Sequence, residues 1–310
     1  MTSRRAIEAI GRTPLLDLQK LRPEGGARIL AKWEGANPTG SMKDRMALAM
    51  IQGATREGRL SPGQRVVEYT GGSTGSSLAF VCAALGHPLS IVTADCFSEE
   101  KIRTMRALGA EVEVLKTPEG KVYAGLGARL MERAREIQKE TGAYWTNQVH
   151  NPHQTEGYAG MAREILAECP GVTDFVMAVG GGGCVTGNAR TFREAGVAVR
   201  TTLVEPAEAP YISADSTAGT HRVEGIAVFP RSRLPLLRDD LIDAIVGVPE
   251  EEGRAMARRL AREEGLLAGT SSGLNLVASV RIARERPPQA NVVTVLVDTG
   301  LKYLTGDLYG

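Results

Sequence analysis

The residue best suited to covalent chemistry is Lys43, which lies where a turn-rich run gives way to a helical pattern. The residues from Asn37 to Gly40 favour a turn, and the Ser-x-x-Asp spacing of Ser41 and Asp44 predicts a helix capped by Ser41. A cation in the first helical turn faces the positive end of the helix dipole, which costs a few tenths to about 1 kcal/mol. That field, together with partial burial, favours the neutral amine, which can form a Schiff base with an aldehyde. A solvated surface lysine is the alternative interpretation.

The second feature is a Gly/Ser/Thr-rich segment, residues 70–77, between a strand predicted over 65–69 and an apolar helix predicted over 78–85. A loop of this kind leaves backbone N–H groups to bind an anion at the start of the helix. An ordinary strand–helix turn is one alternative. Another is a serine hydrolase with Ser73 as nucleophile, because residues 71–75 match Gly-x-Ser-x-Gly. That triad requires a histidine late in the chain, and the last histidine is His221.

A third feature is the run of glycines from Gly180 to Gly183, which follows a strand predicted over 174–179 and precedes Cys184. Glycines let the backbone approach an anion closely, and the next helix supplies the positive end of its dipole. A dinucleotide site is the rival, supported by Glu205 at the end of the following strand. The required Gly-x-Gly-x-x-Gly spacing is absent, however, and Cys184 could be a small packing residue.

Two polar residues follow other predicted strands. Thr299 comes after the apolar strand predicted over 292–297, at the carboxyl edge where α/β proteins place their sites, and a helix N-cap is its alternative role. Gln148 either reaches a ligand or is a buried amide satisfied by the backbone.

Composition excludes several classes of function. The chain has 310 residues, 43% of them hydrophobic and 24% charged, with a formal net charge of +1, so nothing favours nucleic acid or an acidic membrane as partner. No apolar run has the length of a membrane span or the character of a signal peptide, which predicts a cytoplasmic protein. Four widely spaced cysteines and one close histidine pair, His150 and His153, argue against a metal site. Alternating strands and helices predict α/β architecture with mostly parallel sheets.

The segment Asn-Pro-Thr-Gly-Ser-Met-Lys-Asp-Arg around Lys43 resembles the lysine segment of the cysteine synthase (O-acetylserine sulfhydrylase) and cystathionine β-synthase family, the fold-type II pyridoxal-phosphate (PLP) enzymes. The other motifs resemble this family in the same order over nearly the whole chain. The resemblance implies a two-lobed fold, each lobe a mostly parallel twisted sheet flanked by helices, with PLP between the lobes. It implies a smaller, mobile lobe over 36–145 and a larger lobe formed by 1–35 plus 146–310.

The resemblance also implies a role for each candidate residue. Lys43 would carry PLP and act as general base, Ser73 would lie beside the cofactor ring, and Thr299 would bind the pyridine nitrogen. The cofactor phosphate would be held by Gly180, Gly181, Gly182, Gly183 and Cys184. The substrate would contact Thr70, Gly71, Gly72, Ser73, Thr74, Gln148 and Gly225. The family has serine and asparagine at the positions of Gly71 and Ser73, and threonines at those of Gly181 and Cys184.

The activity implied by the resemblance is β-replacement on an O-activated serine, with O-acetylserine and sulfide giving L-cysteine and acetate in cysteine biosynthesis. Two alternatives stay open. One is β-elimination, as in a serine, cysteine or threonine dehydratase or a desulfhydrase, and the other is replacement with a different nucleophile. The resemblance also implies a homodimer whose partners are small molecules, without nucleic acid, membrane or metal.

Overall fold

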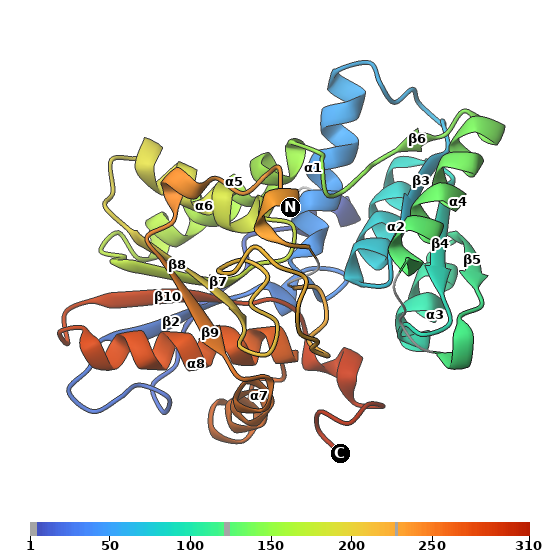
Figure 1. Ribbon diagram of the computed structural model, residues 1–310. Helices are drawn as coiled ribbons and strands as arrows, with labels where there is room; N and C mark the ends of the chain where they lie inside the picture. Colours follow the sequence, from blue (N-terminus) through green and yellow to red (C-terminus); the bar gives the residue numbers. More distant parts are fainter. Residues whose placement is uncertain (1–4, 121–124, 227–228) are drawn as a thin grey trace. The chain divides into compact units, whose positions relative to one another are not determined.

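The computed structural model describes residues 5–120, 125–226 and 229–310. The chain divides into two compact units, each built around its own sheet (Figure 1). The first unit comprises Met1–Ile10 and Lys43–Gln154, and the second comprises Gly11–Met42 and Thr155–Gly310. None of the helices in the described part of the chain has the length and apolar character needed to cross a membrane.

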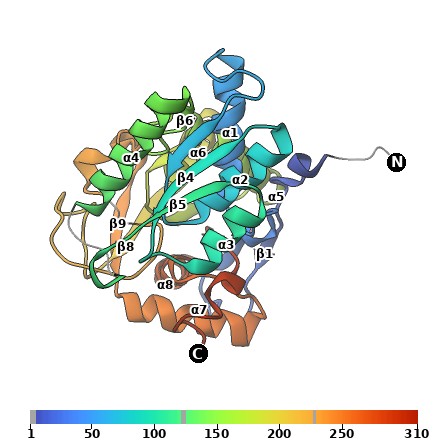
Figure 2. The same cartoon turned by 90° about the vertical axis from the view of Figure 1, so that its right-hand side faces the viewer.

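The first unit contains a four-stranded parallel sheet in the order β5-β4-β3-β6. Its strands are β3 (Val66–Tyr69), β4 (Leu89–Ala94), β5 (Glu111–Leu115) and β6 (Tyr144–Trp145). Its helices are α1 (Lys43–Arg56), α2 (Ser73–Leu85), α3 (Glu99–Ala107) and α4 (Leu126–Thr141), with short 3-10 turns η1 (Ala6–Ala9) and η3 (Pro118–Gly120). Figure 2 shows β4 and β5 side by side.

Helices cover both faces of this sheet because of the order in which the chain visits its strands. The chain moves outward from β3 to β5 and then returns to β6 beyond β3. Right-handed crossovers therefore place α2 and α3 on one face and α4 on the other. Leu126, Leu130, Ala134 and Ile137 recur at helical spacing on α4 and pack against Val67 and Val92 of the sheet.

The second unit contains a six-stranded sheet in the order β1-β2-β10-β7-β8-β9, with β1 antiparallel to β2 and the other pairs parallel. Its strands are β1 (Leu15–Asp17), β2 (Arg28–Trp33), β7 (Asp174–Ala178), β8 (Arg200–Pro206), β9 (Ala244–Val248) and β10 (Asn291–Leu296). Its helices are α5 (His153–Glu168), α6 (Gly183–Glu194), α7 (Glu250–Glu264) and α8 (Thr270–Glu285). Short 3-10 turns complete it: η2 (Glu34–Ala36), η4 (Arg231–Arg233), η5 (Asp239–Leu241) and η6 (Gly300–Tyr303).

The centre of the second sheet is almost entirely apolar. All five residues of β7 and the last five of β10 are buried, which is the pattern of parallel strands covered on both faces. Helices α7 and α8 lie on one side of this sheet and α5 and α6 on the other (Figure 1). Leu274, Leu276 and Val277 of α8 belong to the same core cluster as the strand residues. The predicted α/β class with mostly parallel sheets is confirmed.

One local prediction differs from the structure by one residue. The helix expected to start directly after Ser41 begins at Lys43, one residue later, and Ser41 forms an isolated β-bridge with Asp298. The reason is tertiary, since the amide of Met42 donates to the carbonyl of Val297 (2.9 Å) and so extends the chain along the end of β10. Lys43 still lies in the first turn of the helix, as the sequence predicts.

Candidate active site

In the first unit, the Thr70 loop (residues Thr70–Thr74) and Gln148 follow neighbouring parallel strands, β3 and β6, and therefore meet at one edge of the sheet. The Thr74 hydroxyl donates to Gln148 Oε1 (2.8 Å), and Gln148 Nε2 donates to the carbonyl of Tyr69 (3.4 Å). The structure thus brings these sequence-predicted residues together. Gln148 is neither an isolated surface amide nor an amide paired with backbone alone.

The Thr70 loop ends at the start of a helix. Thr70 Oγ1 accepts a hydrogen bond from Gly72 N (3.1 Å), and Ser73 is the first residue of α2, with Gly72 at the cap position. A glycine cap has no side chain with which to satisfy the first amides of the helix, and such helix starts bind anions. The local geometry therefore fits a carboxylate.

A neighbouring side chain explains why Gly71 is a glycine. A Cβ at Gly71 would lie 2.5 Å from Cγ and Cδ1 of Phe97. Phe97 follows β4, the strand that flanks β3 on the side opposite β6, and its ring is half-buried against the apolar cluster of this unit. Sequence reasoning missed Phe97. The one available signal was that position 71 has a glycine where the family has a serine, which indicates that another group fills the space of the serine side chain.

A second residue that sequence reasoning missed is Glu68, whose carboxylate is completely buried beneath the same loop. Its Oε2 accepts hydrogen bonds from Thr146 Oγ1 (2.6 Å) and Gln148 N (2.9 Å). Its Oε1 accepts from Tyr69 N (2.9 Å) and Trp145 Nε1 (3.2 Å). Burial raises the pKa of Glu68, and the donors act in the opposite direction. The signal in the sequence was a single acid inside the apolar strand Val66–Tyr69.

In the second unit, the glycine turn (residues Gly180–Cys184) follows β7 and includes the first two residues of α6. A Cβ at Gly180 would lie 2.4 Å from the carbonyl oxygen of Gly225, so these two predicted site residues are in contact. Gly182 has a φ of +83° and caps α6, which begins at Gly183. The turn therefore presents a glycine-capped helix start whose backbone can be approached closely, and it fits a phosphate.

Cys184 has a different character from the glycines beside it. Its side chain is buried, and its sulfur lies 3.6 Å from Asn188 Nδ2 one helical turn further on. The hydroxyl of nearby Thr186 is also buried and accepts a hydrogen bond from Arg238 N (3.3 Å). The turn thus offers its backbone amides to an anion, and the Thr186 hydroxyl, which accepts this bond, can still donate its own proton. The buried position of Cys184 agrees with the packing role considered for it.

Thr299 is held against the segment that leads to Lys43. Thr299 N donates to Gly40 O (2.9 Å), and a Cβ at Gly40, whose φ is +69°, would lie 2.5 Å from Thr299 Cγ2. The Thr299 hydroxyl accepts a hydrogen bond from Leu301 N (3.3 Å), which is the predicted alternative role as N-cap. A hydroxyl that accepts this bond can also donate its own proton to a ligand. Lys43 is half-buried.

Gly180 and Thr299 lie at one edge of the second sheet, because β7 and β10 are adjacent and parallel and both residues come after the strands end. Ligands of open α/β sheets bind at this edge. The class of protein defined by these features is an α/β protein with one anion-binding turn at the carboxyl edge of each sheet and a lysine at the start of a helix.

The comparisons with known proteins narrow this class to a family. The chain belongs to the pyridoxal-phosphate dependent enzymes, whose family model matches residues 7–298. It is 34% identical over 306 residues to a cysteine synthase of Staphylococcus aureus (strain N315), covering 97% of this chain and 96% of that protein. The predicted family and its cofactor, PLP, are confirmed, and serine hydrolysis at Ser73 is left without support.

Solved structures agree with this assignment. The chain is similar to O-ureido-L-serine synthase, with a TM-score of 0.91, 32% identity and coverage of 100% of this chain and 96% of that one. It is also similar to a hydrogen sulfide-producing enzyme from Fusobacterium nucleatum, with a TM-score of 0.88, 31% identity and coverage of 98% and 100%. The relatives support PLP-dependent β-replacement as the type of reaction, and their names differ in the β-substituent or product.

Proposed function

We propose that the protein replaces the β-substituent of an O-activated serine, and that O-acetylserine and sulfide, giving L-cysteine and acetate, are its first candidate substrates. The observation that carries this proposal is the pairing of Thr74 with Gln148 at the start of α2, a site that fits an amino-acid carboxylate. The cysteine synthase of Staphylococcus aureus, aligned over nearly the full length of both chains, supports the choice of substrates.

Each part of the proposed site has one task. Bound PLP supplies an electron sink for the negative charge that develops at the substrate α-carbon. Lys43 holds the cofactor covalently and, when released, removes the α-proton as general base. The glycine turn would hold the cofactor phosphate, and Ser73 and the Thr299 hydroxyl would bind the rest of the cofactor, Thr299 as hydrogen-bond partner of its ring nitrogen. The Thr70 loop and Gln148 bind the substrate carboxylate, with Gly225 next to the cofactor.

A different β-substituent, a different nucleophile or β-elimination is the second candidate function. Two observations favour keeping it. The similar solved structures include an O-ureido-L-serine synthase and a hydrogen sulfide-producing enzyme. In addition, the Phe97 ring occupies the space that a side chain at position 71 would need, and this changes the surface of the Thr70 loop. The proposal also includes a homodimer, as the sequence resemblance implies, which light scattering of the purified protein tests.

The experiment compares products with three amino acids. Purified protein is supplied with O-acetylserine and sulfide and assayed for cysteine, then with L-serine or L-cysteine alone and assayed for pyruvate and sulfide. The proposal predicts cysteine formation as the fastest reaction, and loss of turnover in Lys43→Ala. If pyruvate is released from L-serine or L-cysteine faster than cysteine is made from O-acetylserine, β-elimination rather than β-replacement is the main reaction. Turnover unchanged in Lys43→Ala would refute both.

A further inference from the structure

We propose that Glu68 is a positioning residue that holds Gln148 and, through it, Thr74 in the arrangement that receives the substrate carboxylate. The inference rests on the proposed function of the Thr70 loop and deepens it. Glu68 does not itself belong to the predicted substrate contacts. It lies one residue before the end of β3, directly before Tyr69 and the loop.

The buried carboxylate joins the end of β3 to the end of β6 and the turn that follows it, through two backbone amides, the Trp145 indole and the Thr146 hydroxyl. Tyr69 N is the last amide of β3, Trp145 ends β6, and Gln148 N lies in the turn that follows β6. The donor from Gln148 is a main-chain amide, so Glu68 fixes the backbone from which the Gln148 side chain extends. That side chain then pairs with Thr74 and with the carbonyl of Tyr69. Glu68 thereby connects the two segments that form the proposed carboxylate site.

The turn between β6 and Gln148 needs such a connection. Asn147 has a φ of +43°, in the left-handed region that few residues other than glycine adopt, although asparagine tolerates it better than most. The bonds from Thr146 Oγ1 and Gln148 N to Glu68 Oε2 flank this residue on both sides. They hold the chain in a conformation that its own backbone preferences do not favour.

The type of side chain at position 68 also matters. Four donors converge on its two oxygens, and a carboxylate, which only accepts hydrogen bonds, matches all of them. A glutamine has the same shape but turns an amide N–H₂ toward one pair of donors. Glu68→Gln therefore changes the hydrogen bonding under the loop while it preserves the volume of the side chain.

The test compares Glu68→Gln with the matched control Glu111→Gln. Glu111 is an exposed acid on β5 of the same sheet, and it pairs with Arg65 at the surface. Hydrogen exchange of residues 144–150 is followed by mass spectrometry, and KM and kcat are measured with O-acetylserine and sulfide. We expect Glu68→Gln to exchange this segment about tenfold faster or more, as loss of hydrogen bonds to a charged group predicts. We also expect KM for O-acetylserine to rise about tenfold or more, with kcat changed less than about threefold.

Thr146→Val removes only one of the four donors and provides the second variant should Glu68→Gln not fold. It should change exchange and KM in the same direction and to a smaller extent, while Glu111→Gln changes neither. Unchanged exchange in residues 144–150, or a loss confined to kcat, overturns the inference. If the unmodified protein reacts with no amino acid and Glu68→Gln still loosens residues 144–150, the proposed function fails while Glu68 keeps its positioning role.

Discussion

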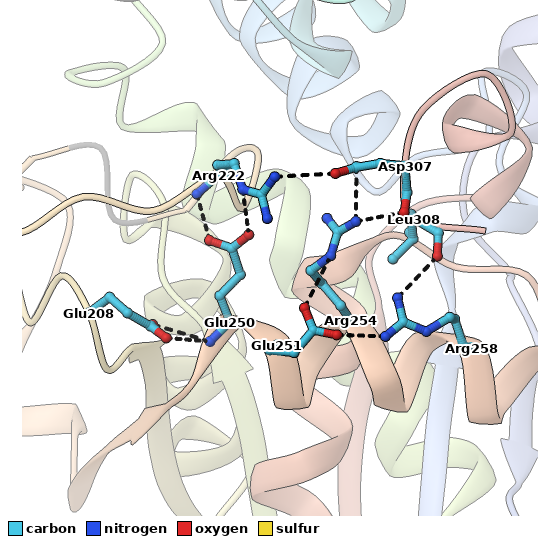
Figure 3. A network of polar contacts seen from close by, with 8 residues as sticks. All are labelled: Glu208, Arg222, Glu250, Glu251, Arg254, Arg258, Asp307 and Leu308. Atoms are coloured by element: carbon cyan, nitrogen blue, oxygen red, sulfur yellow. Dashed lines mark hydrogen bonds and ion pairs between the residues drawn. The ribbon is translucent and has the colours of Figure 1, made fainter. Parts of the chain in front are cut away.

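Two polar networks, one in each unit, show that the same kind of carboxylate contact contributes differently to stability when it is buried and when it is exposed to solvent. The first is the buried network around Glu68, whose carboxylate has no solvent exposure. The second, drawn in Figure 3, joins arginines and acids of α7 with Arg222 and the C-terminal residues Asp307 and Leu308. Arg222 and Asp307 are both about 70% exposed at their side chains, and their atoms Nη1 and Oδ2 lie 3.2 Å apart.

The surface network has more members and more ways to replace a lost contact. Arg254 contacts both Glu251 and Asp307, and Arg258 contacts both Glu251 and the carbonyl of Leu308 (Figure 3). Arg254 is itself only 9% exposed at its side chain, but the two acids that it contacts are about 70% exposed. Ion pairs open to water in this way each contribute between 0 and about 1 kcal/mol, because water and salt screen them. Removing the acceptor at the centre of a buried network leaves neutral donors unpaired, and each unpaired donor costs about 1–3 kcal/mol. Burial, rather than the number of contacts, therefore decides which network matters more.

The largest expected effect on stability comes from Glu68→Ala. The variant leaves four donors without their acceptor, one in a buried and three in partly buried hydrogen bonds, and it removes side-chain volume, so the free energy of unfolding should fall by about 3 kcal/mol or more. Urea unfolding of the variant beside the unmodified protein measures this. A loss below about 1 kcal/mol would mean that the buried network stabilises the fold no more than the surface network does, and would contradict the comparison.

Gly71→Ser should have the next largest effect, because its Cβ would overlap the Phe97 ring. Overpacking of this kind costs about 1–3 kcal/mol, and displacement of the loop should also raise KM for the amino acid. Phe97→Ala removes the ring that a side chain at position 71 would overlap. The combined variant Gly71→Ser/Phe97→Ala should therefore lose about 1 kcal/mol less free energy of unfolding than the sum of the two single losses. Urea unfolding of the three variants provides the double-mutant cycle, and strict additivity would contradict the contact.

Glu250→Gln should have an intermediate effect, because Glu250 is the least exposed acid of the surface network, with 12% side-chain exposure. Its Oε2 accepts a hydrogen bond from Arg222 N (2.7 Å), and its Oε1 lies 3.2 Å from Arg222 Nε. The segment that it holds continues to Gly225, which contacts Gly180 of the glycine turn. We expect a loss of about 1 kcal/mol in urea unfolding and faster hydrogen exchange in residues 221–226. A loss of unfolding free energy as large as that of Glu68→Ala would contradict the conclusion that the buried network stabilises the fold more than the surface network.

Asp307→Asn should have the smallest effect, at most about 1 kcal/mol, and high salt should remove it. The pKa of Asp307 is lowered, chiefly by its hydrogen bond with Arg254. A lowered pKa in the folded state means that the contribution is present above the unfolded pKa, near 4, and is lost as pH falls through the folded value. Urea unfolding should therefore show a smaller difference between variant and unmodified protein at pH 3 than at pH 7. A difference of the same size at both pH values would rule out ionisation as its origin.

The parts of the molecule that the sequence predicts well depend on neighbours along the chain. The turn–helix junctions at Lys43 and at Gly180–Cys184 lie close to where the sequence places them, since turn residues and apolar periodicity are local signals. The helix expected over 78–85 begins five residues earlier, at Ser73, so that the second half of the predicted loop is helical. The α/β class follows from the same alternation.

The parts that it missed depend on which distant segments become neighbours. Glu68 meets Thr146 and Gln148 only because β6 pairs with β3, about 78 residues apart in sequence. Phe97 covers Gly71 only because β4 lies beside β3. The helix start expected directly after Ser41 is shifted by one residue for the same reason, because Met42 pairs with Val297. A lone acid in an apolar strand was the one local sign of the buried network, since a charge there requires partners.

The central claim, that Lys43 carries the cofactor, can be tested by reduction with borohydride followed by peptide mapping. The account predicts one phosphopyridoxyl group, on the peptide that contains Lys43, and none in the Lys43→Ala variant. Recovery of an unmodified Lys43 peptide from protein that contains PLP, or the group on another lysine, would contradict it.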